Sequence, residues 1–369
     1  MNWFPKRPPL YDIKKTYLEN ATLGPFFEGE LPERIYLPEK EWIDFLGFKI
    51  ASPIGVPAGP LLNARWIQLA SSLQFDVLTY KTIRSFEFSG HPLPNMIYVD
   101  TFGMITDEHM PQFCQEIGEP APNIEELAVT NSFGMPSRAP DYLLKDIPAA
   151  KSALQKGQVL IVSVTGTVRS ECTFLEDFVL AARLAKEAGA DLIEANFSCP
   201  NIGKKEGLLY TSPDVVKAIS SALVQAIHPI PLILKVGRLP TFDQMREMMI
   251  TAARSGVKAI AGINTVSMQV RTKEGLPALG PTRLTGGICG GPIRQQGLQF
   301  VKDAHQIRTQ EKLDLKVIGC GGITLAEHFD QYLQAGADLA TAATGMMWDP
   351  YLANRYHKTK TSDKISSLI

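Results

Sequence analysis

The segment Asn196-Phe-Ser-Cys-Pro-Asn201 places the thiol of Cys199 between two carboxamides. It directly follows residues 190–195, which have the apolar pattern of a buried strand. A thiol can accept a proton or act as a nucleophile, and Asn side chains supply paired donors and acceptors for a planar amide or imide. Taken alone, such a segment is more typical of a buried packing cysteine and of asparagines that cap turns. Chemistry here is favoured only if other strand ends carry matching groups.

The elements that position this segment follow from a repeated alternation of short apolar runs and longer amphipathic runs. That alternation is typical of βα units and a parallel sheet. Eight runs fit the strands of a (β/α)8 TIM barrel, an α/β fold: 51–58, 76–81, 159–165, 191–196, 232–236, 259–264, 316–319 and 338–343. Helices are predicted over 63–74, 177–188, 212–227, 241–255, 292–310 and 325–335. Gly189, Gly256 and Gly336 are typical helix stop signals.

Two regions lie outside the regular repeat. Residues 1–45 are rich in Pro, aromatic and charged residues without a clear period, and we interpret them as an N-terminal arm or cap on a barrel domain of residues 46–369. A long insertion follows the second predicted strand and includes Gly90-His-Pro-Leu-Pro94 and Asn131-Ser-Phe-Gly-Met-Pro136. Loops of this length are usually functional, so the segment 131–136 is expected to fold over a site.

Polar residues and glycines recur where the predicted strands end. In a (β/α)8 barrel these ends meet at one face, where reactive groups sit and where phosphate is commonly held after strands seven and eight. The strand ends carry Lys81, Asn196, Lys235, Asn264-Thr265, Gly319-Cys-Gly-Gly-Ile323 and Thr344-Gly345. A lone Gly-x-Gly-Gly is weak evidence, but its place at strand seven together with Thr344 favours a phosphate site.

The run Gly286-Gly-Ile-Cys-Gly-Gly291 is too rich in glycine to be the interior of a helix. It fits either a flexible linker or a backbone that lies against a flat ligand. Its position between strands six and seven favours the second interpretation.

Composition narrows the class of protein. The 369 residues favour one large domain, 45% hydrophobic residues can bury a substantial core, and a net charge of −1 gives no electrostatic case for nucleic acid as a partner. The five cysteines are odd in number and lack C-x-x-C spacing, which argues against a disulfide framework, a metal site or a protein-held iron–sulfur cluster. With no apolar run of transmembrane length and no signal peptide, we expect a cytoplasmic protein.

Five motifs in order resemble those of dihydroorotate dehydrogenases. They are Thr79-x-Lys-Thr82, Gly90-His-Pro-Leu-Pro94, Asn131-Ser-Phe-Gly-Met-Pro136, Asn196-Phe-Ser-Cys-Pro-Asn201 and Gly319-x-Gly-Gly-Ile323. The cysteine form of the fourth motif is similar to the soluble class 1 branch of that family. The resemblance covers about residues 46–350, whereas the arm and residues 100–129 do not match the compact soluble enzymes.

The resemblance implies an FMN-containing barrel that oxidises dihydroorotate to orotate in pyrimidine biosynthesis. Cys199 would be the base that removes the C5 proton, while a hydride passes from C6 to flavin N5. The residues implied for substrate binding are Lys81, Asn131, Phe133, Gly134, Met135, Asn196, Asn201, Asn264 and Thr265. Those implied for FMN binding are Ala58, Gly59, Lys81, Thr82, Asn196, Lys235, Gly290, Gly291, Gly321, Gly322, Thr344 and Gly345. We expect a homodimer, and an electron-transfer partner subunit is compatible with the sequence.

Two other functions fit part of this pattern. A related FMN enzyme acting on uracil or thymine would share the Asn-x-Ser-Cys-Pro segment, but the segment 131–136 resembles an orotate-binding loop more closely. A flavin-binding partner subunit without turnover would not need Cys199, both lysines and all four asparagines. The electron acceptor is left open between fumarate, a quinone and NAD reached through a partner flavoprotein.

Overall fold

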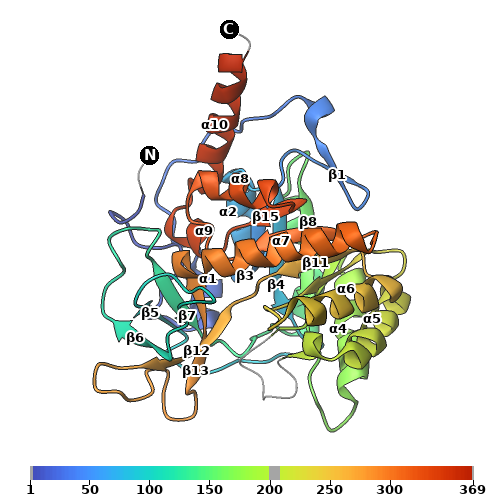
Figure 1. Cartoon of the computed structure of the whole chain (residues 1–369), viewed down its shortest axis with the longest axis horizontal. Helices are drawn as coiled ribbons and strands as arrows, with labels where there is room; N and C mark the ends of the chain where they lie inside the picture. The colour runs from blue at the N-terminus through green and yellow to red at the C-terminus, as the bar shows by residue number, and fades with distance from the viewer. Residues whose placement is uncertain (1–2, 199–207, 368–369) are drawn as a thin grey trace.

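The computed structural model describes residues 3–198 and 208–367 (Figure 1). Eight parallel strands close into a barrel in chain order, and the last strand pairs with the first. They are β3 (Ile54–Leu61), β4 (Val77–Ile83), β8 (Val159–Val164), β9 (Leu192–Asn196), β10 (Leu232–Lys235), β11 (Ala259–Gly262), β14 (Lys316–Cys320) and β15 (Leu339–Thr341). Each strand coincides with one of the eight predicted runs, so the predicted α/β barrel is confirmed.

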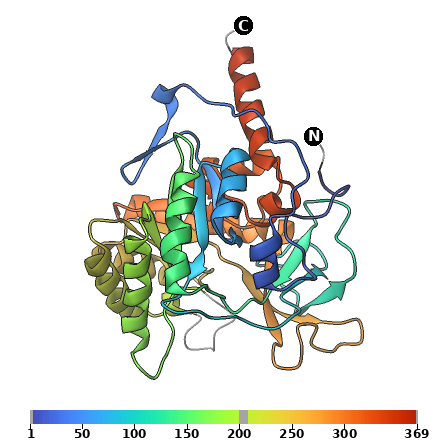
Figure 2. The ribbon, with the colours of Figure 1, turned by 180° about the vertical axis from the view of Figure 1, so that it is seen from behind.

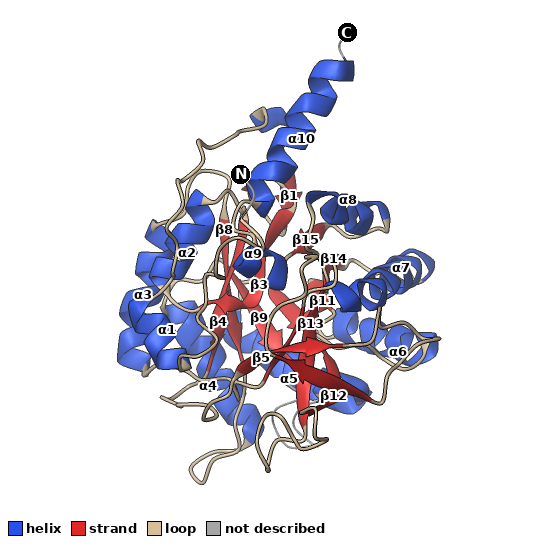
Figure 3. Ribbon diagram, turned by 90° about the vertical axis from the view of Figure 1, so that its left-hand side faces the viewer, coloured by secondary structure: helices blue, strands red, loops and turns tan. Residues whose placement is uncertain are grey.

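Helices cover the outside of the barrel, as the blue helices around the red strands in Figure 3 show. The six predicted helices are α2 (Ala64–Ser72), α4 (Phe174–Glu187), α5 (Pro213–Ile227), α6 (Phe242–Arg254), α7 (Arg294–Gln310) and α8 (Ala326–Gln334). A capping box starts α4, because the Thr173 hydroxyl accepts the N–H of Glu176 at 3.2 Å and the Glu176 carboxylate accepts the Thr173 N–H at 2.8 Å. Gly189, Gly256 and Gly336 have φ values of 89, 88 and 108° at helix ends, as expected for stop signals.

Other helices were not predicted. The longer ones are α3 (Pro140–Ser152), which lies between β7 and β8 in the chain, and α10 (Leu352–Ser367), which projects from the body with the C-terminus in Figure 1. Pro140 is tolerated at the helix start, but Pro148 lies inside α3, where proline normally argues against a helix. The shorter ones are α1 (Tyr17–Leu23), α9 (Thr344–Trp348) and the 3-10 turns η1 (Glu39–Glu41), η2 (Leu209–Thr211) and η3 (Gly291–Ile293). Within the described ranges, no helix is both long and apolar enough to span a membrane.

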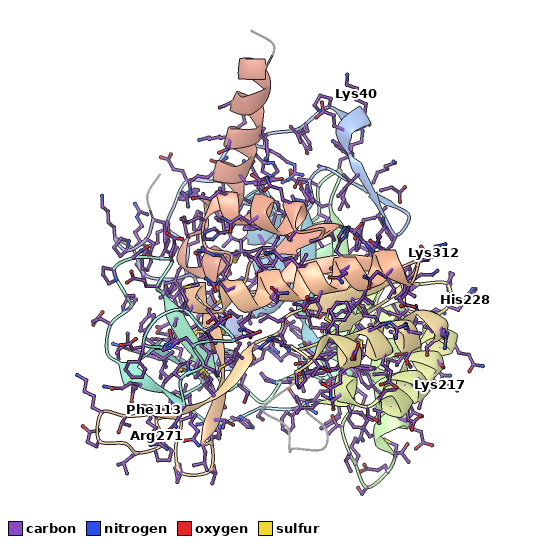
Figure 4. The ribbon with its side chains drawn as sticks, in the orientation of Figure 1. Lys40, Phe113, Lys217, His228, Arg271 and Lys312 are labelled. Carbon is purple, nitrogen blue, oxygen red and sulfur yellow. The ribbon has the colours of Figure 1, made fainter. Side chains whose placement is uncertain are left out.

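A second, smaller closed sheet joins two distant insertions. It contains β5 (Met96–Asp100), β6 (Phe113–Ile117) and β7 (Ala128–Asn131) from the region after β4, together with β12 (Val266–Arg271) and β13 (Thr285–Gly290) from between β11 and β14. The guanidinium of Arg271 on β12 lies 4.9 Å from the ring centre of Phe113 on β6, and Figure 4 labels both residues. Because residues 285–290 form a paired strand, the interpretation of this glycine-rich run as a flexible linker is wrong.

The amino-terminal ends of the barrel strands enclose an apolar cluster. In a barrel, alternate residues of each strand face the interior. Near the strand starts these inward positions are apolar, and they include Val77, Val159, Leu192 and Ile233. A hairpin of β1 (Ile43–Phe45) and β2 (Phe48–Ile50) packs onto them, and its Phe45 is 1% exposed. The hairpin therefore closes this end of the barrel. The predicted division between an arm at 1–45 and a barrel at 46–369 falls in its turn.

The segment before this hairpin, which includes α1, runs along one side of the molecule, as Figure 2 shows in blue. It is fixed to the barrel at several points. The N–H of Leu10 donates to the carbonyl of Met347 at 2.9 Å, and the Asn63 side chain donates to the carbonyl of Ala21 at 2.7 Å. The ring of Tyr11 packs edge-on against Phe133, with ring centres 5.7 Å apart. The arm is therefore part of the wall beside the segment 131–136.

Replacing the aromatic side chain that closes the barrel should destabilise the protein strongly. Phe45→Ala is expected to lower the free energy of unfolding by about 3–5 kcal/mol, because it leaves a cavity in a close-packed interior. The matched control is Phe102→Ala, since Phe102 is 46% exposed, and its effect should stay below about 1 kcal/mol. Denaturant-induced unfolding of both variants measures the difference, and equal midpoints would show that the hairpin does not close the barrel.

Candidate active site

A cavity of about 1030 Å³, counted out to its open mouth, lies at the carboxyl ends of the barrel strands. This is the face where (β/α)8 barrels build their sites. Thirteen of the residues predicted for substrate or cofactor line it: Ala58, Gly59, Lys81, Thr82, Asn131, Phe133, Gly134, Met135, Asn196, Lys235, Asn264, Thr265 and Thr344. The barrel closes these strand ends into one ring, so residues far apart in sequence meet in a single cavity.

The electrostatic character of the cavity comes from two lysines near strand ends. Lys81 on β4 is 7% exposed and Lys235 on β10 is 3% exposed, so both are buried. None of the lining residues that the structure describes is an Asp or a Glu. Buried ammonium groups are costly unless they are compensated, so this lining suits an anionic or electron-rich ligand.

One buried carboxyl lies below the cavity floor. Glu194 precedes Asn196 by two residues on β9, so both side chains point into the barrel. Burial raises the pKa of the Glu194 carboxyl, and the charge of Lys235 and a hydrogen bond from Ser163 oppose that rise. Glu194 and Lys235 therefore interact inside the barrel, but burial outweighs the lysine charge in its effect on the pKa of Glu194.

Two of the predicted asparagines bond to one another and to the strand end before Cys199. The Asn264 amide donates to the Asn196 side-chain oxygen at 3.4 Å and also to the carbonyl of Ser198. The Asn196 oxygen accepts the N–H of Ser198 at 3.1 Å. These bonds fix the backbone at Ser198. Cys199 and Asn201, predicted as the base and a substrate ligand, lie outside the described residues.

The pairing of β13 with β7 places Asn131 beside a cysteine that the sequence did not assign to the site. Asn131 is paired in register with Gly287, and its amide donates to the sulfur of Cys289 at 3.2 Å. Burial raises the pKa of the Cys289 thiol to about 11, although the bond from Asn131 opposes the rise. Cys289 is therefore a neutral thiol at neutral pH.

Five predicted cofactor residues do not line the cavity: Gly290, Gly291, Gly321, Gly322 and Gly345. Their small size has a packing reason in the structure. A Cβ at Gly290 would come within 2.0 Å of the Leu127 carbonyl oxygen, and one at Gly291 within 1.7 Å of the Glu125 carbonyl oxygen. Gly321 and Gly322 have φ values of 124 and 69°, which favour glycine. Contact of these glycines with a cofactor stays a prediction.

Sequence reasoning missed several lining residues, among them Tyr11, Tyr17, Met96, Cys289 and Trp348. Tyr11 and Tyr17 come from the arm, and Met96 and Cys289 come from the second sheet. Cys289 lies in the glycine-rich run that the sequence analysis placed against a flat ligand, but the pattern did not single out its thiol. The other four are marked by no local motif, because each reaches the cavity through contacts between distant segments. The aromatic content of the arm was the one available signal.

The fold and the cavity define a (β/α)8-barrel protein with a cavity at its strand ends that is lined by two buried lysines. Comparison with known proteins gives a more specific result. A family model described as dihydroorotate dehydrogenase matches residues 98–360. A dihydroorotate dehydrogenase of Dictyostelium discoideum is 47% identical over 371 residues, which cover 98% of this chain and 100% of that protein. The chain therefore belongs to the dihydroorotate dehydrogenase family of oxidoreductases, and the resemblance seen in the motifs is confirmed.

Two further relatives show the range of this similarity. The catalytic subunit of dihydroorotate dehydrogenase B (NAD(+)) from Anoxybacillus flavithermus is 28% identical, over 64% of this chain and 71% of that protein. The subunit PreA of the NAD-dependent dihydropyrimidine dehydrogenase of Escherichia coli is 32% identical, over 52% of this chain and 45% of that protein.

The glycine corner between β13 and η3 offers a test of the packing that shapes the cavity. Gly290→Ala should destabilise the protein by more than about 2 kcal/mol, because the new Cβ meets the Leu127 carbonyl and φ is 103°. Gly275→Ala separates the two causes, since φ there is 85° but nothing lies within 4 Å of the new Cβ. That control should cost about 1–2 kcal/mol. Unfolding midpoints that rank the two variants in the opposite order would contradict the close approach at Gly290.

Proposed function

We propose that this chain oxidises dihydroorotate to orotate with FMN, as a cytoplasmic enzyme of pyrimidine biosynthesis. The observation that carries the proposal is the cavity itself, in which two buried lysines and three asparagines meet, with no acidic side chain among the lining residues that the structure describes. Dihydroorotate and orotate carry a carboxylate and a cyclic ureide, and the cavity offers partners for both. The near full-length relative named dihydroorotate dehydrogenase supports the same substrate.

The residues present fit a flavin phosphate. Lys81 and Lys235 offer buried cations, Thr82 and Thr344 offer hydroxyls, and Ala58 and Gly59 leave room for a flat ring. A Cβ placed on Gly59 would meet nothing within 4 Å, so open space adjoins this backbone. When bound, FMN supplies the acceptor for the hydride from C6 of the substrate. A lysine beside the ring stabilises the negative charge of its reduced form.

Substrate binding is assigned to the amides and to the loop after β7. Asn131, Asn196 and Asn264 can orient a planar ureide, because each side chain has a donor and an acceptor end. An amide left without its partner in a buried site is costly, so a ring that lacks a matching group is rejected. The backbone of Phe133, Gly134 and Met135 faces the carboxylate side of the substrate in this proposal, with Thr265 and Lys81 nearby.

Cys199 is proposed as the base that takes the C5 proton. Support comes from Ser198, the residue before it, whose N–H and carbonyl are held by Asn196 and Asn264. Ser198 itself lines the cavity. Asn201 is proposed as a further substrate ligand on the same segment.

The partners of the reaction are proposed more broadly. Steady-state assays can be made with fumarate, with a quinone and with NAD reached through a partner flavoprotein as the electron acceptor. The acceptor that supports the highest rate identifies the physiological type. A homodimer is proposed as the assembly. A flavin-binding subunit without turnover is the alternative that such assays would expose.

The function is tested by the visible spectrum of the purified protein. We expect a yellow protein that releases FMN on denaturation and is bleached by dihydroorotate in the absence of oxygen. Dihydrouracil is the matched control, because it lacks the carboxylate and a relative of this chain is named a dihydropyrimidine dehydrogenase subunit. Bleaching by dihydrouracil alone would replace the proposal with a uracil oxidoreductase, and a colourless protein that takes up no FMN would refute it.

The base is tested by a cysteine series. Cys199→Ala should keep the flavin but slow its reduction by dihydroorotate by roughly 10²–10⁴-fold, since general base catalysis contributes about that much. Cys199→Ser should retain part of the rate. Cys172→Ala is the matched control, because Cys172 is a free cysteine that does not line the cavity. Rapid-mixing reduction kinetics measure all three, and a parental rate in Cys199→Ala would remove the base assignment.

A further inference from the structure

Arg84, the residue that directly follows β4, is almost completely buried, with 3% of its surface exposed. Its side chain does not line the cavity, but it binds the loop that does. The guanidinium Nε donates to the carbonyl of Met135 at 3.0 Å, and Nη2 donates to the carbonyl of Gly134 at 3.1 Å. A planar fork thus holds two consecutive peptide carbonyls.

Further contacts fix the guanidinium in place. Its third nitrogen, Nη1, donates to the hydroxyl of Thr167, and its carbon lies 4.5 Å from the centre of the Phe88 ring. The backbone N–H of Arg84 donates to the Ser137 hydroxyl at 3.0 Å. Arg84 is therefore held by Thr167, by Phe88 and by Ser137 at the end of the loop, so the loop carbonyls are bound to a fixed group.

The directions of the Phe133 and Gly134 carbonyls decide the directions of the N–H groups of Gly134 and Met135. In a trans peptide the N–H points opposite to the C=O of the same unit. The carbonyl of Gly134 points to Arg84, so the N–H of Met135 points away from Arg84, toward the cavity that both residues line. The carbonyl of Phe133 accepts the N–H of His91 at 2.8 Å, which orients the N–H of Gly134 in the same manner.

This arrangement requires an unusual backbone. Gly134 and Met135 have φ values of 70 and 54°, both in the left-handed region. For methionine that conformation is strained, so surrounding contacts must hold it. Successive N–H groups in such a turn form a concavity that suits an anion.

We infer that Arg84 is a positioning residue that sets the substrate preference of the enzyme. By holding the carbonyl of Gly134 outward, it presents the N–H of Met135 to the carboxylate of the ligand. Its bond to the carbonyl of Met135 anchors the turn, because the following Pro136 has no N–H to present. The inference rests on the proposed function, because it takes orotate and dihydroorotate as the ligands of this loop. Arg84 itself touches neither the substrate nor the flavin.

The experiment compares two changes at this position. Arg84→Lys keeps a positive charge but cannot bind both carbonyls through one planar group, whereas Arg84→Met removes charge and fork together. Both should weaken orotate binding by on the order of 10²-fold, since a small misplacement of a binding group can cost that much. The dissociation constant is measured from the shift of the flavin spectrum, with the neutral methyl ester of orotate as comparator. The preference for orotate over its ester should fall in both variants.

The matched control is Arg65→Lys. Arg65 also donates to two backbone carbonyls, those of Thr22 at 2.7 Å and Leu23 at 3.4 Å, but neither Arg65 nor these two residues line the cavity. Its orotate affinity should equal that of the parent. If Arg84→Lys binds orotate as tightly as the parent, the inference is wrong, since charge alone would then suffice.

A second variant covers the case in which the changes at Arg84 prevent folding. Thr167→Val loosens the guanidinium without touching the loop, and it should weaken orotate binding several-fold while leaving the affinity for the ester unchanged. No change in orotate binding would overturn the inference. Failure of the parent protein to bind orotate would instead refute the proposed function, so the two failures are distinguishable.

Discussion

The change from aliphatic to polar side chains along the inner face of the barrel strands is the constraint on which the structure depends. On β9 the inward residues are Leu192, Glu194 and Asn196, and on β10 they are Ile233 and Lys235. Parallel pairing brings Asn196 level with Lys235. Glu194 is level with Ile233, so the change begins one inward residue earlier on β9 than on β10. The apolar half can therefore be packed by the hairpin, while the polar half remains available to a ligand.

The polar half of the barrel contains charged side chains whose burial costs free energy. Lys235 is buried, and a buried cation is costly unless an opposite charge or a bound anion compensates it. Glu194 supplies a nearby carboxyl inside the barrel, where burial and the lysine act on its pKa in opposite directions. The cavity above has no acidic lining residue in the described part of the chain. We therefore assign the remaining compensation of the Lys235 charge to a bound ligand, which accords with the flavin phosphate and carboxylate substrate proposed.

The second sheet contributes part of the wall of the cavity at the barrel mouth. It pairs β7 with β13, two strands that belong to different insertions, and so sets the position of Asn131 and of the loop that follows. Arg84 at the end of β4 and Tyr11 in the arm contact the same loop from different directions. The loop is therefore held by the barrel, by the second sheet and by the arm together.

The sequence by itself determined the family, the eight strands and six of the helices, because apolar periodicity, caps and glycine stops act over a few residues. It also determined which polar groups stand at strand ends, since a parallel barrel brings those ends to one face. The helix α3 was not predicted from the sequence, because Pro148 lies inside it and proline normally argues against a helix. Only the tertiary structure decided that residues 285–290 are a strand, that Cys289 lies beside Asn131 and that Arg84 holds Gly134 and Met135. Those contacts join segments far apart in the chain, and their free energy comes from mutual burial and pairing, for which no short stretch of sequence carries a signal.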